Sequence, residues 1–350
     1  MTSTRTSRPA PFPTGSSGLT RIDDFDAVLS LSPNWEQSYV QLGRGAPSTQ
    51  LSFARTPSME LTVASRAPGV LFQGAPPRGM AVVAVNLHGP SLHLQRHRWE
   101  GDLLGVVPRG GEFEIISNTP HTLFGLCVDH DLLDEAALAH WGHPFPERLS
   151  GPGLRFRDPM SRLRLVSTWA RWLRRVQLQP GMLADSGLVA LMEQEVVDVV
   201  VGSVEPAVPA PPIDPRRSVA LRAEAFLRRS LDEPVRIGDV CAAARASRPT
   251  LHASFLATFG TSPMAYWKAL RLSAARRDLK QARHGTTVAA VAMKWGFFRL
   301  GYFSADYCAM FCERPSETLR RATGRVPQGV SMDRPGRRGS PSATETDQFQ

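Results

Sequence analysis

An apolar pattern that occurs twice in the last third of the chain constrains its fold more than any other feature. Within each copy the apolar residues recur at every fourth position, and the second copy is displaced from the first by 52 residues. The repeated positions are Leu251, Phe255 and Phe259, followed by Phe303, Tyr307 and Phe311. Residues four apart lie on one face of an α-helix, so each copy predicts a helix with one buried stripe. A shorter apolar segment precedes each copy (237–241 and 288–292), and each pair predicts a helix, a tight turn and a second helix.

The residues between the two copies predict one continuous helix. Ser262 is a typical N-cap, Pro263 suits the first helical position, and the helical pattern continues to Ala282. At 1.5 Å per residue, about 20 residues span roughly 30 Å, and successive major grooves on one face of DNA lie about 34 Å apart. Such a helix suits two recognition helices that enter neighbouring grooves. A generic all-helical bundle is the alternative, and it has no need of that spacing.

Positive charge is concentrated in the same part of the chain. Residues 213–325 contain 20 Lys and Arg against 9 Asp and Glu, whereas the whole chain carries only +9. A basic segment beside a nearly neutral remainder favours a polyanion partner for that segment alone. An incidental surplus of arginine is the alternative explanation.

Composition divides the chain into five segments. Residues 1–18 are rich in Ser, Thr, Pro and Arg and lack the apolar core of a secretory signal, so we expect a disordered lead. Five prolines in the eleven residues Glu205–Pro215 predict a Pro-rich linker between a domain at 19–204 and another at 216–325. Residues 326–350 show no periodicity and predict a disordered tail.

Short apolar or β-branched segments separated by Gly and Pro fill the first part of the 19–204 domain. The segments expected to be strands are 37–42, 50–54, 59–64, 69–73, 80–87, 92–96 and 122–128. This spacing predicts a β-sandwich or jelly-roll barrel. Helical periodicity follows at 129–141, 158–177 and 185–201. We therefore expect an α+β chain in which a strand-rich domain with following helices precedes an all-α domain.

The C-terminal residues resemble the AraC/XylS-type DNA-binding domain, a double helix-turn-helix. The first half of the resemblance rests on Cys241, Ser247, Leu251, Phe255, Phe259, Gly260, Pro263, Tyr266, Leu270, Arg271 and Arg276. The second half rests on Val291, Ala292, Gly296, Phe297, Tyr302, Phe303, Tyr307, Phe311, Pro315 and Arg320. The resemblance covers residues 216–325. It implies a sequence-specific transcriptional regulator, not an enzyme, with a cupin-like N-terminal barrel for sensing or dimerisation.

The resemblance also implies which side chains meet DNA. The expected base contacts are Arg248, Thr250 and His252 in the first unit, and Arg299, Tyr302 and Ser304 in the second. The expected phosphate contacts are Arg236, Arg245, Lys268, Arg276, Lys280, Thr287 and Lys294. The base-facing set is short of the Arg, Lys, Asn and Gln that usually read base edges. Either thymine-methyl and shape readout dominate, or the recognition helices present faces to DNA that are rotated from those expected here.

One residue departs from the family pattern at the end of the second unit. Cys312 stands where the family generally has glycine. A residue other than glycine costs about 1 kcal/mol where φ is positive. The second unit is therefore expected to be less stable or to end its helix differently.

A metal-dependent cupin enzyme fused to a DNA-tethering domain is the alternative function. His88, His93, His97 and Glu100 suggest a metal site, but their spacing is not the His-x-His pair expected of a metal-binding cupin. We therefore expect no metal and no cofactor. The four cysteines do not form a disulfide framework, and we expect a cytoplasmic protein with no membrane segment.

Several partners are expected from the regulator interpretation. They are double-stranded DNA, a small-molecule effector, a second copy of the chain joined through the arginine-rich helices, and RNA polymerase if the protein activates transcription. The sequence does not identify the effector or the operator.

Overall fold

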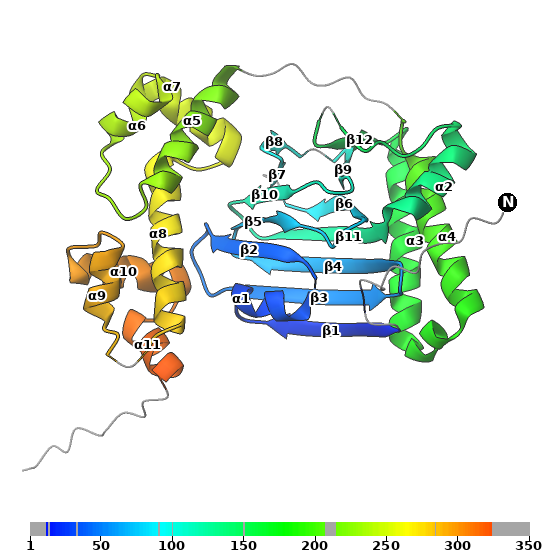
Figure 1. Ribbon diagram of the computed structural model, residues 1–350, viewed down its shortest axis with the longest axis horizontal. Coiled ribbons are helices and arrows are strands. Elements are labelled where there is room, and N and C mark those ends of the chain that lie inside the picture. Colours follow the sequence, from blue (N-terminus) through cyan, green and yellow to red (C-terminus); the bar gives the residue numbers. More distant parts are fainter. Residues whose placement is uncertain are drawn as a thin grey trace, which may run out of the picture.

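The computed structural model describes residues 12, 15–32, 34–89, 92–99, 101–149, 151–206, 215–283 and 285–323. The strands all lie in the first half of the chain, and the helices after residue 214 gather on one side of them (Figure 1). The expected α+β class, with an N-terminal strand-rich unit (15–206) and an all-α C-terminal unit (215–323), is confirmed.

The strands form two antiparallel sheets. The seven-stranded sheet has the order β1-β3-β4-β11-β6-β9-β12, and the five-stranded sheet has the order β2-β5-β10-β7-β8. The bounds are β1 Ser16–Ile22, β2 Glu36–Gln41, β3 Ser48–Arg55, β4 Met59–Ala67, β5 Val70–Ala75, β6 Met80–His88, β7 Leu92–Leu94, β8 His97–Arg98, β9 Leu103–Val107, β10 Phe113–Ser117, β11 His121–Asp129 and β12 Gly153–Arg155. The two sheets face each other as in a cupin-like jelly roll, although they do not join into one closed barrel.

Five of these strands were not predicted from the sequence: β1, β8, β9, β10 and β12. β9 and β10 are only five residues long, and β1 is an edge strand that is mostly half-buried. Predicted disorder in 1–18 is wrong at Phe12, which is 2% exposed, and at Ser16–Gly18, which pair with β3. β1 is stabilised by pairing with β3, whose partner residues lie 27 to 39 positions further along the chain, and local composition does not report such a partner.

Helices cover the outer face of the seven-stranded sheet. They are α2 His130–Trp141, α3 Pro159–Leu178 and α4 Ser186–Ser203, close to the predicted ranges. Trp169 and Trp172 of α3 are almost fully buried in an apolar cluster that α3 shares with α2, α4 and the sheet. Three short elements complete this unit: α1 Phe25–Val28, η1 Leu29–Leu31 and η2 Pro180–Ala184.

The C-terminal unit contains seven helices among the described residues. They are α5 Pro215–Arg229, α6 Ile237–Ala244, α7 Arg248–Phe259, α8 Pro263–Lys280, α9 Val288–Lys294, α10 Leu300–Phe311 and α11 Pro315–Thr323. α5 begins at the last residue of the predicted linker, and residues 207–214 of that linker lie outside the described residues.

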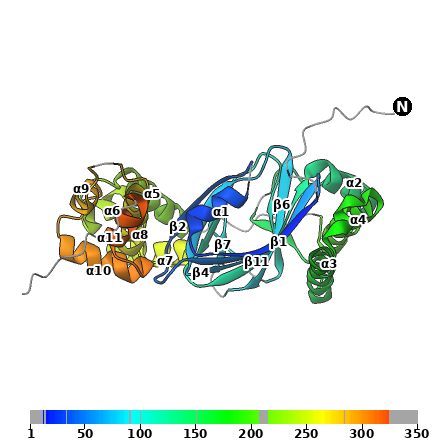
Figure 2. The ribbon, with the colours of Figure 1, turned by 90° about the horizontal axis from the view of Figure 1, so that it is seen from below.

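The C-terminal unit packs against the outer face of the five-stranded sheet. Val40, Leu71 and Ile116 of that sheet belong to one apolar cluster with Leu251 and Phe255 of α7. The molecule is therefore layered: α2–α4, the seven-stranded sheet, the five-stranded sheet, then the C-terminal helices (Figure 2). None of the helices in the described ranges is long and apolar enough to span a membrane.

Candidate nucleic-acid interface

The first helix-turn-helix unit consists of α6 and α7. Ser247 caps α7, where its hydroxyl accepts a hydrogen bond from the Thr250 backbone N–H at 3.3 Å. Gly260 ends α7 with a φ of +67°, a left-handed conformation that glycine adopts without a Cβ penalty. The stripe Leu251, Phe255 and Phe259 is fully buried, as the spacing predicted.

The second unit consists of α9 and α10. Thr287 caps α9 and accepts from the Ala290 N–H at 3.1 Å. Arg299 occupies the N-cap of α10 without a side-chain capping bond. Cys312 ends α10 with a φ of +54°, so the predicted left-handed position carries a non-glycine residue.

α8 joins the two units as one continuous helix, with α5–α7 at one end and α9–α11 at the other (Figure 1). It begins after the predicted Ser262 cap and has 18 residues, which at 1.5 Å each span about 27 Å. This length is of the same order as the roughly 34 Å between successive major grooves on one face of DNA.

A buried arginine fastens the second unit to α8. Arg271 is 6% exposed, and its guanidinium carbon lies 4.1 Å from the Trp267 ring centroid and 4.6 Å from that of Phe297. Its Nε donates to the Trp295 carbonyl at 2.5 Å. Burial lowers the pKa of Arg271 to about 10, so the guanidinium remains charged at neutral pH. The turn between α9 and α10 therefore depends on a cation held between two aromatic rings.

The predicted base contacts lie on the two recognition helices, outside the buried stripes. Arg248, Thr250 and His252 are exposed on the first turns of α7. Tyr302 is 69% exposed at the start of α10, where the Arg299 guanidinium lies 5.8 Å from its ring centroid. Ser304 is half-buried one position after the buried Phe303. The Thr250 hydroxyl already hydrogen-bonds Ser247 at 2.8 Å.

Three of the predicted phosphate contacts are exposed, and none of the three forms an ion pair with a carboxylate in the described part of the chain. Arg236 is the N-cap of α6, and its backbone N–H donates to Asp239 at 2.8 Å. Arg245 ends α6 with a φ of +52°, and Thr287 lies at the N-terminus of α9. Such positions suit contacts to phosphate oxygens.

The other four predicted phosphate contacts already hold carboxylates. Lys268 pairs with Asp306 at 3.0 Å, and Lys294 pairs with Asp278 at 2.7 Å.

The remaining two of these four, Arg276 and Lys280, connect α8 to the short helix α1. Arg276 is 9% exposed and pairs with Glu313 at 2.9 Å, and its Nη1 lies 3.5 Å from Asp24. The Lys280 ammonium lies 2.5 Å from Asp24 and 2.6 Å from Asp26. Both cations therefore connect the C-terminal unit to the N-terminal unit.

The sequence analysis missed an apolar surface beside the second recognition helix. Met293, Phe298 and Leu300 are 54%, 69% and 40% exposed and flank Tyr302 around the turn into α10. In the first unit Leu256 of α7 is 48% exposed. The consecutive Phe297 and Phe298 were the available signal, because only one of two neighbouring residues can face the core of a tight turn.

The N-terminal unit touches the first recognition helix at its C-terminal end. His93 lies 3.1 Å from the Ala257 carbonyl, and the Asn118 amide donates to the Phe259 carbonyl at 3.0 Å. Burial lowers the pKa of His93, which therefore stays neutral in this contact. The exposed side chains of α7 are left clear by these contacts.

Two of the three histidines that suggested a metal site have other partners. His93 contacts α7, and His97 accepts from Arg217 at 2.5 Å. Glu100 lies outside the described residues. In the part of the chain that the structure describes, no three His, Cys, Asp or Glu side chains are grouped to hold a metal ion.

Known proteins resemble the C-terminal part of the chain in sequence. The probable thc operon regulatory protein of Rhodococcus erythropolis is 32% identical over 96 residues, which are 27% of this chain and 29% of that protein. The XylDLEGF operon transcriptional activator 3 of Pseudomonas putida is 30% identical over 101 residues, which are 29% of this chain and 30% of that protein. The chain thus matches less than a third of the length of these relatives.

Two solved structures illustrate the range of the structural matches. A probable AraC family transcriptional regulator from Rhodopseudomonas palustris is 36% identical and covers 30% of this chain and 96% of its own, with a TM-score of 0.28. ToxT from Vibrio cholerae is 12% identical and covers 83% of this chain and 99% of its own, with a TM-score of 0.28.

The family match agrees with the geometry of α6–α11. Residues 240–321 match the family described as a helix-turn-helix domain. This range begins within α6 and ends within α11, so it includes most of the first unit, the helix α8 and all of the second unit. The sequence match and the arrangement of α6–α11 thus agree on a helix-turn-helix domain in the C-terminal unit.

Proposed function

We propose that this protein is a sequence-specific DNA-binding transcriptional regulator that responds to a small-molecule effector. One observation carries the proposal: two helix-turn-helix units stand at opposite ends of the single helix α8. Each recognition helix buries one stripe in its unit and exposes the other face. The regulatory activities named for the relatives support the same conclusion for the matched segment.

Base recognition in this proposal relies on both polar and apolar groups. Arg248, His252 and Arg299 supply hydrogen-bond donors, and Leu256 and Tyr302 supply apolar contact of the kind that thymine methyl groups accept. Arg236 and Arg245 of the first unit, together with the α9 N-terminus at Thr287, position the domain on phosphates.

The remaining partners are part of the same proposal. The N-terminal unit binds the effector or joins two copies of the chain, and α3 with its arginines is the proposed dimer face. RNA polymerase is the further partner if the regulator activates transcription. We infer that the protein acts on DNA in the cytoplasm.

Recovery of bound DNA from a random library tests the proposal. Purified full-length protein should retain duplexes that share a motif in two parts about one helical turn apart. Affinity should fall steeply with salt because cationic side chains release counterions from DNA. Absence of both enrichment and binding at low salt would contradict the proposal.

A further inference from the structure

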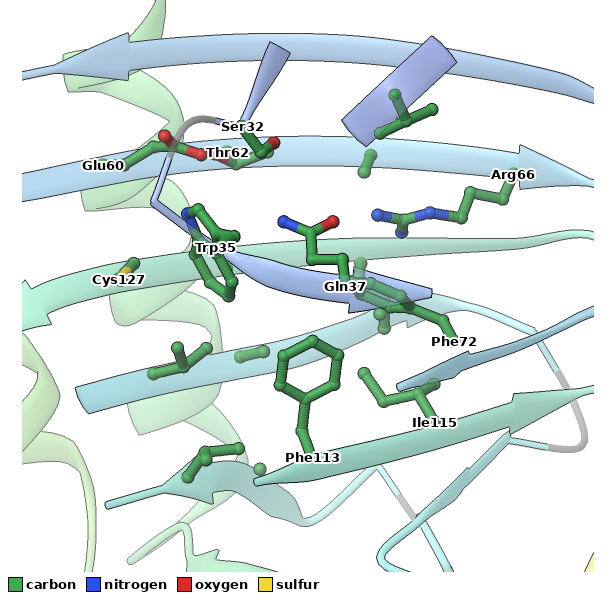
Figure 3. A pocket seen from close by; sticks show the side chains of 18 of the residues that line it. Ser32, Trp35, Gln37, Glu60, Thr62, Arg66, Phe72, Phe113, Ile115 and Cys127 are labelled. Atoms are coloured by element: carbon green, nitrogen blue, oxygen red, sulfur yellow. Dashed lines mark hydrogen bonds between the residues drawn. The ribbon is translucent and has the colours of Figure 1, made fainter. Parts of the chain in front are cut away.

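A cavity of about 110 Å³ lies between the two sheets of the N-terminal unit. β4 lines one side with alternate residues, Glu60, Thr62, Ala64 and Arg66, because successive side chains of a strand point to opposite faces. Phe72 of β5 and Phe113 and Ile115 of β10 line the other side (Figure 3). The space is comparable to an engineered cavity of about 150 Å³ that binds benzene.

Arg66 brings a buried positive charge to this largely apolar space. Its side chain points toward Gln37 across the cavity (Figure 3), and the residue is 7% exposed. The guanidinium lies 4.8 Å from the Phe72 ring centroid, and Nη2 is 3.4 Å from the Tyr39 hydroxyl. Nε is buried without a hydrogen-bond partner, and among the described ion pairs none joins Arg66 to a carboxylate.

The acidic residue in the cavity wall does not neutralise Arg66. Glu60 pairs with Arg55 at 2.5 Å and accepts from the Thr62 hydroxyl at 3.0 Å. Arg66 instead disfavours charge on its neighbour His121: burial first, and the Arg66 charge second, lower the pKa of His121 to about 3. A buried cation without an anion is costly, so the site favours a ligand that brings a negative charge.

A second donor without a partner lines the same cavity. The Trp35 indole N–H is buried and unbonded, and its ring packs edge-on against Phe113 with centroids 6.1 Å apart. Two unpaired buried donors in one cavity require acceptor atoms, which water or a ligand can supply. The rings and aliphatic side chains around them require the rest of that ligand to be apolar.

We propose that this cavity binds a small apolar monocarboxylate, about the size of one six-membered ring, whose carboxylate accepts hydrogen bonds from Arg66. This inference deepens the proposed function, because it assigns a chemical class to the effector. Arg66 and the Trp35 N–H select for acceptors, and the Phe72, Phe113 and Ile115 side chains contact the apolar body.

The position of the cavity links the ligand to the DNA-binding domain. The five-stranded sheet separates the cavity from the C-terminal helices. Tyr39 and Phe72 face the cavity, whereas Val40 and Leu71 pack against the C-terminal helices. A ligand that shifts β2 or β5 therefore acts on residues that contact α7.

Calorimetric titration of the full-length protein with cyclohexanecarboxylate and with cyclohexanecarboxamide tests the proposal. The carboxylate should bind, and the neutral amide of the same shape should bind at least about ten-fold more weakly, because hydrogen bonds to a charged group are stronger. Phenylacetate and butyrate test the size limit. Undetectable carboxylate binding at millimolar concentration, or equal binding of the amide, would overturn the assignment.

Three variants locate the site. Arg66→Met should reduce carboxylate affinity at least about ten-fold and abolish the preference over the amide. Arg78→Met is the matched control, because Arg78 is exposed in the turn before β6. Trp35→Phe, which removes the indole N–H and preserves an aromatic side chain, should reduce affinity by about five-fold. Circular dichroism establishes that each variant is folded, and unchanged affinity in both cavity variants would refute the site.

DNA binding by the same protein separates the two proposals. Sequence-specific DNA binding without carboxylate binding would overturn the ligand assignment and leave the regulator function standing. Carboxylate binding without any DNA binding would overturn the regulator function and leave the ligand assignment standing.

Discussion

The two helix-turn-helix units follow one sequence pattern but have different surroundings. The first unit shares an apolar cluster with the five-stranded sheet and receives hydrogen bonds from His93 and Asn118. The second unit forms its apolar cluster with α8 and α11, and Leu42 of the N-terminal unit packs against that cluster. The Met310 carbonyl of α10 also accepts hydrogen bonds from the Gly45 backbone N–H at 3.1 Å and from the Gln41 side-chain amide. The first unit thus shares an apolar cluster with the five-stranded sheet, whereas the second unit packs mainly on α8 and contacts the N-terminal unit through Leu42 and Met310.

The largest expected effect concerns the second unit's dependence on Arg271. Gly296 has a φ of +69°, and a Cβ there would lie 1.9 Å from Arg271 Nη2. Gly296→Ala should lower the free energy of unfolding by about 3 kcal/mol through backbone strain and displacement of the guanidinium. Thermal unfolding of the full-length protein measures the loss.

Gly301→Ala is the control for this substitution in the same unit. A Cβ at Gly301 meets no atom within 4 Å, and the residue lies within α10. Alanine there should stabilise the protein by about 0.5–1 kcal/mol. Equal effects of the two substitutions would show that Arg271 does not fasten the turn.

The next largest expected effect is a difference between the two helix-turn-helix units in how strongly ligand binding in the cavity changes their DNA binding. Saturating cyclohexanecarboxylate should change the affinity for DNA by about five-fold or more, a common size for coupling between two sites. Because α7 packs on the shared sheet, the change should concentrate on the part of the DNA motif read by the first unit. Footprinting with and without the carboxylate measures this, with Arg66→Met as the control. A change confined to the part of the motif read by the second unit would show that the cavity is coupled to the second unit and not to the first.

The sequence predicted the C-terminal unit far more completely than the N-terminal one. Local sequence signals are enough to predict most of a helix-turn-helix. Ser247 and Ser262 are N-caps, and the apolar residues at every fourth position, such as Leu251 and Phe255, mark the buried face. Sheet order depends instead on partners distant in sequence, and β1 was missed for that reason.

The same limit applies to the candidate sites. Residue type predicted Lys280 as a phosphate contact, but its pairing with Asp24 requires two segments more than 250 residues apart to meet. The sequence did not predict Arg66 as a ligand-binding residue, since no local feature distinguishes an arginine that lines a cavity from one on a solvated strand.

Base readout is expected to differ between the units. His252 is exposed on α7, whereas Ser304 is half-buried on α10. His252→Ala should therefore cost about 1–3 kcal/mol of preference at one base position if it contacts a base. Ser304→Ala should cost less, because a hydroxyl discriminates bases weakly. Selection from a randomised site library ranks the two variants, and a larger loss for Ser304→Ala would invert the ranking.

Phosphate contacts offer a further contrast. Arg245 in the first unit is exposed, whereas Lys280 on α8 is held by Asp24 and Asp26. Arg245→Gln should reduce the slope of log affinity against log salt by about 0.9, the value for one phosphate contact. Lys280→Gln should leave the slope nearly unchanged while Asp24 and Asp26 occupy it. A lower slope for Lys280→Gln would show that Lys280 leaves α1 to meet DNA.

The smallest expected effect lies at the end of the second recognition helix. Cys312 adopts a φ of +54°, whereas the equivalent Gly260 of the first unit adopts +67° without a side chain to strain. Cys312→Gly should raise the free energy of unfolding by about 1 kcal/mol, because glycine has no Cβ penalty in the left-handed region. Cys308→Ala is the control, since it removes a half-buried thiol within α10 and leaves the left-handed position unchanged. Hydrogen exchange resolved along the chain should show the gain in protection within α10 and not in α7. Protection that rises equally in both helices would mean that the two units open together, and the second unit would then not be the weaker one.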